Sequence, residues 1–225
     1  IPQSDNAVPI ISPAPTLVVT DPTASPTVLP IPTLTFATFN IAKPNNTAVP
    51  SWKKRREAIG RTINESNSDV IGLQEATQIR VIGEGGERMT HWQDIQAMSA
   101  AAGYVPTTTE VDTCDPNSCI HSAHILYKAD KVKQVDLPEG IPSAGQGRLT
   151  DIVDGLRYAK TREFSWAYLE GLNGTGVFLA VSLHLNNEKN ARGKKDRELV
   201  GGALTKWAED LNKASGLEGV PMILM

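Results

Sequence analysis

The stretch that decides the fold class is REFSWAYLEGLNGTGVFLAVSLHL, residues 162–185. Two runs rich in apolar and aromatic residues, 162–170 and 177–185, stand on either side of the turn sequence GLNGTG. This pattern predicts a β-hairpin. The second run delivers one polar residue, His184, to its carboxyl end, which makes that end a candidate site.

The remaining segments predict a layered protein with helices and strands alternating along the chain. Short runs with β-rich or apolar character predict strands, and longer runs with apolar spacing near 3.6 predict helices. The strands are expected at 34–41, 69–75, 122–130, 131–137 and 221–225, and the helices at 52–66, 87–103 and 191–213.

Local signals place some of the boundaries of these elements. Ser51 is expected to cap the first helix, and Gly103 to end the second. The third helix places Leu199, Ala203, Leu204, Trp207 and Leu211 on one face. Residues 138–156 are expected to form a long loop. The order β-α-β-α, several β, then α-β indicates the α/β class, with mixed sheets covered by helices.

Composition divides the chain into two parts. With 225 residues, 40% of them hydrophobic, the chain can hold one sizeable domain and an appendage. Residues 1–33 contain eight of the 15 prolines and predict an extended linker, so the domain is expected at 34–225. Such a linker favours an exported, extracellular or cell-surface protein with an upstream domain or anchor.

The overall charge and hydropathy argue against a strongly basic nucleic-acid-binding protein and against a membrane-spanning protein. The net charge is −3, so no strong basic field indicates nucleic acid by itself. No run reaches the ~18 consecutive apolar residues of a membrane-spanning helix. We expect a protein without a transmembrane segment, and a monomer.

The two cysteines, Cys114 and Cys119, lie in the turn-like sequence TCDPNSCIH. They can close a small disulfide loop or remain two thiols in a turn, and the exported context favours the disulfide. A zinc site would need more ligands at finger-like spacing than the nearby His121 and His124.

Three predicted strands end on side chains that can carry chemistry. They deliver Asn40, then Gln74 with Glu75, and His184. The carboxyl ends of strands line the ligand crevice of open α/β sheets, so an amide, a carboxylate and an imidazole there favour a hydrolytic site. Taken one at a time, the same residues also suit a strand cap, a solvated acid at a helix start and a structural histidine.

In these motifs the sequence resembles the endonuclease/exonuclease/phosphatase family, which includes deoxyribonuclease I-like nucleases, sphingomyelinases and inositol polyphosphate 5-phosphatases. The resemblance runs from Leu34 to Met225 in the family's order and spacing. It implies a deoxyribonuclease I-like α/β sandwich of mixed sheets flanked by helices. The matching motifs are TFNI (38–41), IGLQEA (71–76), HILYKADKV (124–132), REFSWAYLE (162–170) and VSLHL (181–185).

The resemblance also implies roles for individual residues. Asn40 matches an asparagine that orients phosphate or metal-bound water, and Glu75 a glutamate that ligates a divalent cation. His184 matches a histidine that acts at the scissile phosphate as general acid or electrostatic partner. Arg162 matches an arginine near phosphate, with Arg157 as a competing alignment.

Those residue types suit metal-assisted phosphodiester hydrolysis. A hard cation on oxygen ligands neutralises phosphate charge and helps to activate water, which favours Mg²⁺ or Mn²⁺, with Ca²⁺ as a further candidate. Histidine moves protons near neutral pH, and the arginine fork fits phosphate oxygens.

The resemblance also implies motifs that this sequence does not contain. In the family, an apolar strand leads into Gly-Asp-x-Asn, and Ser-Asp-His follows near the carboxyl terminus. VPMILM, residues 220–225, matches the strand before the first of these motifs. We therefore expect the chain to be truncated at its carboxyl end, to bind metal weakly and to be poorly active, with the activity belonging to the intact protein.

Two basic stretches bear on the substrate. KKRR (53–56) follows the first motif, and KNARGKKDR (189–197), with five basic residues of nine, follows His184. They favour an extracellular endonuclease acting on nucleic acid, or they are the solvated starts of two helices. The alternative is a phosphatase or sphingomyelinase-like phospholipase acting on an inositol phosphate or lipid headgroup. An alternative of another class is a non-catalytic exported binding module on a proline-rich stalk.

Overall fold

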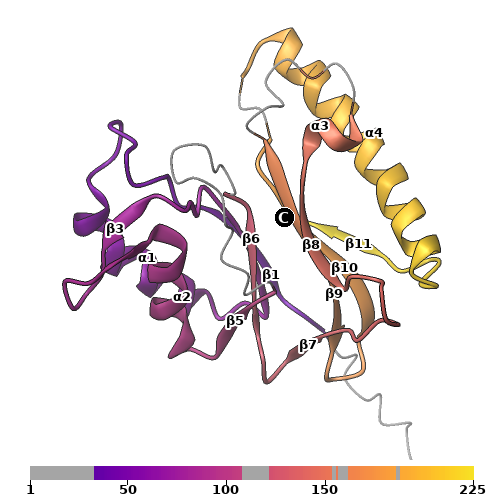
Figure 1. Ribbon diagram of the computed structural model, residues 1–225, viewed down its shortest axis with the longest axis horizontal. Coiled ribbons are helices and arrows are strands. Elements are labelled where there is room, and N and C mark those ends of the chain that lie inside the picture. The colour runs from indigo at the N-terminus through magenta and orange to yellow at the C-terminus, as the bar shows by residue number, and fades with distance from the viewer. Residues whose placement is uncertain (1–32, 108–121, 154–155, 157–161, 186–187) are drawn as a thin grey trace, which may run out of the picture. The chain divides into compact units, whose positions relative to one another are not determined.

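Two β-sheets lie against each other in the computed structural model, with helices on their outer faces (Figure 1). The structure describes residues 33–107, 122–153, 156, 162–185 and 188–225, which belong to one unit of the chain, Pro32–Met225. The linker predicted at 1–33 therefore lies almost wholly outside the described residues.

The first sheet carries the amino-terminal half of the domain. Its strand order is β1-β2-β6-β5, in which β1 and β2 are parallel and the other neighbours are antiparallel. The strands are β1 (Phe36–Asn40), β2 (Val70–Gln74), β5 (Tyr104–Pro106) and β6 (His124–Lys128). Two short strands, β3 (Arg80–Ile82) and β4 (Arg88–Thr90), form a separate antiparallel pair.

The second sheet is built on the predicted hairpin. The antiparallel strands β9 (Glu163–Gly171) and β10 (Gly176–Leu183) form that hairpin. The strand order is β11-β10-β9-β7, and β8 also pairs with β9. The other strands are β7 (Val132–Gln134), β8 (Ala144–Arg148) and β11 (Met222–Leu224), of which β11 is parallel to β10.

The described helices cover the outer faces of the sheets and complete two cores. Ile63 of α1 (Trp52–Ser66) and Ile95 of α2 (His91–Ala100) pack with Leu73 of the first sheet. Leu204 of α4 (Ala191–Ala214) packs with Leu179 of the second sheet, beside the short α3 (Leu149–Ile152). Each helix buries an apolar face against a sheet, as an amphipathic helix requires.

A third core fills the space between the two sheets. Val70 and Ile125 of the first sheet pack with Leu169 and Ala180 of the second. At Gly72 the sheets approach so closely that a Cβ atom would lie 3.2 Å from the Ser182 side chain. The structure therefore has the predicted α/β class and layered architecture.

Several sequence expectations need correction. The 87–103 segment is not one helix: β4 comes first, and Thr90 then begins α2 through a capping box with Gln93. The expected loop 138–156 contains β8 and α3. Leu199 is 44% exposed, because the buried face of α4 runs through Val200 and Leu204 instead.

The strands expected at 122–130 and 131–137 both exist, but they lie in different sheets. Their connection of three residues, 129–131, carries the chain from β6 in the first sheet to β7 in the second. In the part of the chain that the structure describes, no helix combines the length and the apolar character needed to cross a bilayer.

Candidate active site

Parallel pairing of β1 and β2 brings Asn40 and Glu75 together. Asn40 is paired with Gln74 in the register of the two strands, so Glu75 is the first residue beyond the end of β2. The Asn40 amide Nδ2 donates to Glu75 Oε1 at 3.1 Å. Gln74 turns the other way, is buried, and bonds to Thr38 and Ser182 between the sheets. Glu75, and not Gln74, is therefore the side chain that can contact a ligand at this end of the sheet.

The turn after β1 holds the other carboxylate oxygen. The Lys43 N–H donates to Glu75 Oε2 at 2.9 Å, and the Ala42 N–H donates to Asn40 Oδ1 at 3.0 Å. Ala42 and Glu75 have φ angles of 54° and 64°, in the left-handed region that disfavours non-glycine residues. Such strain costs about 1–3 kcal/mol per residue and is found at functional sites, where surrounding contacts maintain it.

The hairpin of the second sheet brings Arg162 and His184 together. Arg162 precedes β9 and His184 follows β10, and Phe164 pairs with Leu183 at that end of the hairpin. Arg162 Nη1 lies 2.9 Å from His184 Nδ1. A guanidinium can only donate, so Nδ1 is the acceptor and the proton of the neutral imidazole lies on Nε2.

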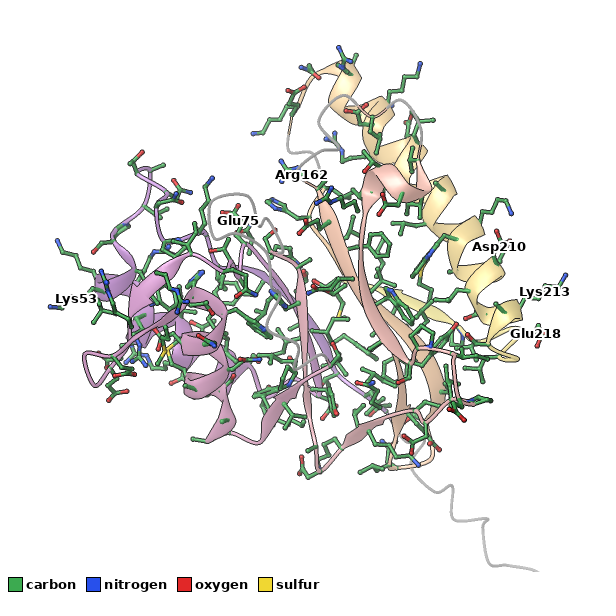
Figure 2. All side chains as sticks on the ribbon, viewed as in Figure 1. Lys53, Glu75, Arg162, Asp210, Lys213 and Glu218 are labelled. Carbon is green, nitrogen blue, oxygen red and sulfur yellow. The ribbon has the colours of Figure 1, made fainter. Side chains whose placement is uncertain are left out.

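The two pairs meet across the sheets. His184 Nε2 lies 3.7 Å from Glu75 Oε1, and both side chains are about one fifth exposed, at 18% and 21%. Figure 2 shows Glu75 and Arg162 on the two sheets, near the same end. Asn40, Glu75, His184 and Arg162 therefore form one cluster, as the sequence predicts.

Burial and neighbouring charges set the ionisation of this cluster. Burial raises the pKa of Glu75, but hydrogen bonds from Lys43 N–H and Asn40, with the influence of His184 and Lys43, leave it below its ordinary value. Burial, and then the charge of Arg162, lower the pKa of His184, and Glu75 opposes them only in part. Near neutral pH the cluster therefore holds a carboxylate, a neutral imidazole and a guanidinium.

The donor set fits a hard cation in part. Glu75 offers two carboxylate oxygens, each with one hydrogen bond and remaining lone pairs, and Asn40 Oδ1 lies beside them. Mg²⁺ accepts few protein oxygens and keeps several waters. Among the described residues no group of three or more His, Cys, Asp or Glu side chains could hold a metal. Glu75 and Asn40 therefore supply one side of a cation site.

The basic stretch 53–56 divides into two exposed and two engaged side chains. Lys53 and Lys54 are exposed. Arg55 donates to four backbone carbonyls of the segment before its own helix. Arg56 pairs with the buried Asp94 and with Glu84. Half of this stretch is therefore structural, and only its first two residues can meet a polyanion.

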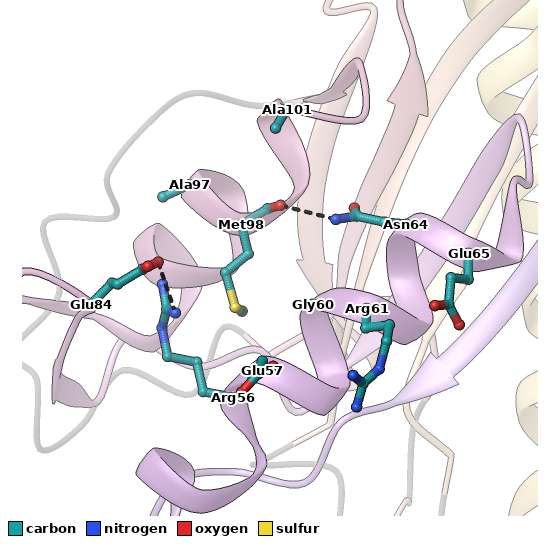
Figure 3. A pocket seen from close by; sticks show the side chains of 10 residues that line it. All are labelled: Arg56, Glu57, Gly60, Arg61, Asn64, Glu65, Glu84, Ala97, Met98 and Ala101. Carbon is teal, nitrogen blue, oxygen red and sulfur yellow. Dashed lines mark hydrogen bonds and ion pairs between the residues drawn. The ribbon is translucent and has the colours of Figure 1, made fainter.

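Arg56 also lines a pocket of about 510 Å³ between α1 and α2 (Figure 3). Its lining carries charges of both signs, and the dashed contacts of Figure 3 join Arg56 to Glu84 and Asn64 to the Met98 carbonyl. The lining includes neither Glu75 nor His184, so this pocket is separate from the cluster.

The basic stretch 189–197 begins α4. Asn190 caps the helix by accepting from the Gly193 N–H at 2.8 Å. Lys194 pairs with Glu198, and Arg197 donates to the Glu188 carbonyl. Three further basic side chains are exposed and have no ion pair within the described residues: Lys189, Arg192 and Lys195.

Sequence reasoning missed two residues that the structure brings to the cluster, Lys43 and Arg55. Both lie within 15 residues of Asn40, but neither lies at a strand end, where a polar residue after an apolar run stands out in the sequence. Arg157, the competing phosphate contact, lies outside the described residues, as do Cys114 and Cys119. The disulfide therefore stays a prediction.

Solved structures resemble this fold. An endonuclease/exonuclease/phosphatase family protein from Bacteroides thetaiotaomicron aligns with a TM-score of 0.59 and 20% identity, over 85% of this chain and 62% of that chain. The mannosyl-6-phosphatase Bt3783 of Bacteroides thetaiotaomicron VPI-5482 gives 0.59 and 20%, over 85% and 64%. The human Nocturnin catalytic domain, solved with bound sulfate, gives 0.56 and 16%, over 83% and 61%.

The chain therefore has the fold of the endonuclease/exonuclease/phosphatase family, as its motifs predict. It spans less than two thirds of the length of these solved chains. No family model matches the sequence, and no curated protein matches it at a significant level.

Proposed function

We propose that this chain is part of a divalent-metal-dependent phosphoester hydrolase. The observation that carries the proposal is the convergence of Asn40, Glu75, His184 and Arg162 from the ends of two sheets. The similarity in fold to a mannosyl-6-phosphatase and to other family proteins supports the same reaction class. Because the chain spans about three fifths of those proteins, the activity is assigned to the full-length protein.

Each residue has a role that follows from its contacts. Glu75, ionised and positioned by Asn40 and the Lys43 N–H, would hold Mg²⁺ or Mn²⁺ with Asn40. When bound, the cation would neutralise phosphate charge and lower the pKa of a bound water. Arg162 presents a guanidinium to phosphate oxygens beside His184.

His184 is the proton-transfer group. Its proton lies on Nε2, the nitrogen that faces Glu75, because Nδ1 accepts from Arg162. From Nε2 the imidazole can donate a hydrogen bond to an oxygen of the substrate and stabilise negative charge there. Arg162 thus both contacts phosphate and fixes the tautomer of His184.

For the substrate, an extracellular endonuclease acting on phosphodiesters in nucleic acid is the first candidate. The exposed Lys53, Lys54, Lys189, Arg192 and Lys195 support it, because exposed cations attract a polyanion. The proline-rich composition of residues 1–33 supports export.

A phosphomonoester phosphatase is the second candidate. The specific observation in its favour is the similarity in fold to a mannosyl-6-phosphatase, with a TM-score of 0.59. A phosphomonoester is small, so this alternative needs no extended basic surface. It is compatible with the contacts of Arg55 and Arg56, which are engaged inside the domain.

The test uses the full-length protein with three substrates: a DNA oligonucleotide, an RNA oligonucleotide and a sugar phosphate. We expect hydrolysis of at least one with Mg²⁺ or Mn²⁺, loss with EDTA, and a loss of about 10²-fold or more in His184→Ala. Lys206→Ala, an exposed change on α4, is the matched control. Full activity in His184→Ala, or no metal-dependent turnover of any phosphoester, would contradict the proposal.

A further inference from the structure

The turn after β1 carries a cation that no strand-end motif includes. Lys43 is exposed, and its backbone N–H is bonded to Glu75 Oε2 at 2.9 Å, so the residue lies directly beside the carboxylate. Its ammonium makes no ion pair with any described carboxylate, Glu75 included. The charge is therefore beside the cluster and available to a ligand.

The electrostatics of the cluster agree with this position. The charge of Lys43 contributes to the lowered pKa of Glu75 and, together with burial and Arg162, to the lowered pKa of His184. Lys43 thus acts on groups of both sheets. An ammonium whose charge acts on both groups and is paired with neither suits an incoming anion.

Arg55 fixes the path of the turn that presents Lys43. Its Nη1 donates to the Ile41 carbonyl, and its Nη2 donates to the carbonyls of Ala42, at 2.5 Å, and Lys43, at 3.0 Å. Its Nε donates to the Pro50 carbonyl at 2.8 Å. A guanidinium has five N–H donors. Because Arg55 donates to four carbonyls, it positions the backbone and has few donors left to bind a ligand.

The same contacts explain how a strained turn is maintained. Ala42, with φ of 54°, lies between two carbonyls that Arg55 holds, and its own N–H is held by Asn40. The direction in which Lys43 leaves the turn is therefore set by these backbone contacts and not by the lysine side chain itself.

We propose that Lys43 is a second cationic contact, beside Arg162, for the phosphate group bound at Glu75 and His184, and that Arg55 is a positioning residue for it. This inference rests on the proposed function, since it names a further residue of the same site. Arg162 approaches the phosphate from the second sheet and Lys43 from the first, so the anion lies between two cations carried by separate sheets.

The test measures binding of inorganic phosphate to the 225-residue chain by NMR titration at constant ionic strength. Lys43→Met is expected to weaken binding about two- to five-fold, the range of an exposed charge pair, with a smaller effect at higher salt. Lys43→Arg, which keeps the charge, is expected to restore binding. Lys213→Met is the matched control, because Lys213 is an exposed lysine in the last turn of α4 that Figure 2 places apart from Glu75.

Three results would overturn the inference: no change in Lys43→Met, an equal change in Lys213→Met, or no measurable phosphate binding by the unsubstituted chain. The hydrolase proposal is judged separately by turnover of the full-length protein. If Arg162→Met weakens phosphate binding and Lys43→Met does not, the proposed function stands and Lys43 has no part in it.

The role of Arg55 has its own readout. Arg55→Met is expected to speed hydrogen exchange at the Lys43 amide and to weaken phosphate binding no further when combined with Lys43→Met. Arg55→Lys cannot supply the fork of donors and is not expected to rescue the exchange rate. Additive losses in the double variant would show that Arg55 does not act through Lys43.

Discussion

Arg162 Nη1 lies 2.9 Å from His184 Nδ1, and this contact holds the imidazole neutral with its proton on Nε2. Burial and the Arg162 charge both lower the pKa of His184. We therefore expect Arg162→Met to raise that pKa toward its ordinary value and to free Nδ1 for protonation. A ¹⁵N NMR titration of the imidazole measures both. Arg61→Met, on the exposed face of α1, is the control, and an unchanged His184 titration in Arg162→Met would refute the assignment.

We expect the free energy of unfolding to depend on pH because of His91. It is fully buried, and burial first, then Arg55 and His124, lower its pKa from 6.5 to about 3. Below pH 6.5 the unfolded chain therefore takes up a proton at His91 that the folded chain does not take up until about pH 3. From this residue alone, the free energy of unfolding falls with falling pH by up to about 1.4 kcal/mol per pH unit.

The test compares urea unfolding of the unsubstituted chain and His91→Asn between pH 7 and pH 5. Asparagine can keep an acceptor for the Thr77 N–H, which bonds to His91 Nδ1, but it does not titrate. The variant is expected to lose part of the slope, whatever its stability at pH 7. The same slope in both proteins would mean that His91 does not contribute.

If a cation binds at Glu75, adding the metal should raise the stability of the folded chain. A cation that binds only the folded chain raises its stability by about 1.4 kcal/mol at ten times the dissociation constant. We expect millimolar MnCl₂ to raise Tm, EDTA to reverse the rise, and Glu75→Gln to abolish it. Glu57→Gln, an exposed change on α1, should leave the rise intact. A rise that persists in Glu75→Gln would place the cation elsewhere.

Asp94 joins α1 and α2 through a buried charge. Its carboxylate accepts from Trp52 Nε1 at 2.7 Å and pairs with Arg56 at 2.8 Å, and its side chain is 1% exposed. Asp94→Ala leaves the buried Trp52 Nε1 without its acceptor and Arg56 with only the exposed Glu84, and is expected to cost about 3 kcal/mol of the unfolding free energy. Asp210→Ala, which removes the exposed pair with Lys206, should cost about 0.5 kcal/mol or less. Similar losses by urea denaturation would contradict this difference.

Two helix starts offer a matched comparison. The Thr90 hydroxyl accepts from the Gln93 N–H at 3.1 Å, and the Thr90 N–H donates to Gln93 Oε1 at 2.9 Å, whereas Ser51 makes no side-chain capping bond. Thr90→Ala is therefore expected to lower the free energy of unfolding by about 1 kcal/mol, and Ser51→Ala by much less. Chemical denaturation of both variants measures the difference, and an equal loss would mean that the Thr90 bonds do not contribute.

The convergence of three of the candidate residues is predictable because strand ends can be recognised in the sequence. Asn40, Glu75 and His184 each follow an apolar run, and the parallel pair β1–β2 and the hairpin β9–β10 bring such ends to one edge. Arg162 is found by resemblance, since an arginine before a strand has no distinguishing local pattern.

The residues that sequence reasoning missed depend on contacts distant along the chain or on irregular backbone. In the sequence, Arg55 is one of four cations in KKRR and resembles a surface residue. In the structure it donates to carbonyls of the turn at 41–43. Gln74 stands next to Glu75 in sequence, but strand alternation sends it between the sheets. The β8 strand, AGQGR, carries two glycines and little apolar pattern, and it is a strand because it pairs with β9.

At Glu75 the left-handed backbone, with φ of 64°, favours a different residue from the one that the proposed cation site requires. Glycine or asparagine would adopt this geometry at lower free energy, so variants chosen for heat tolerance alone should drift toward them at position 75. Such a protein would keep the fold and have a higher Tm, yet it would lack the carboxylate that the proposed cation site requires. The proposed cation site therefore explains why a glutamate, and not a glycine, occupies this backbone conformation.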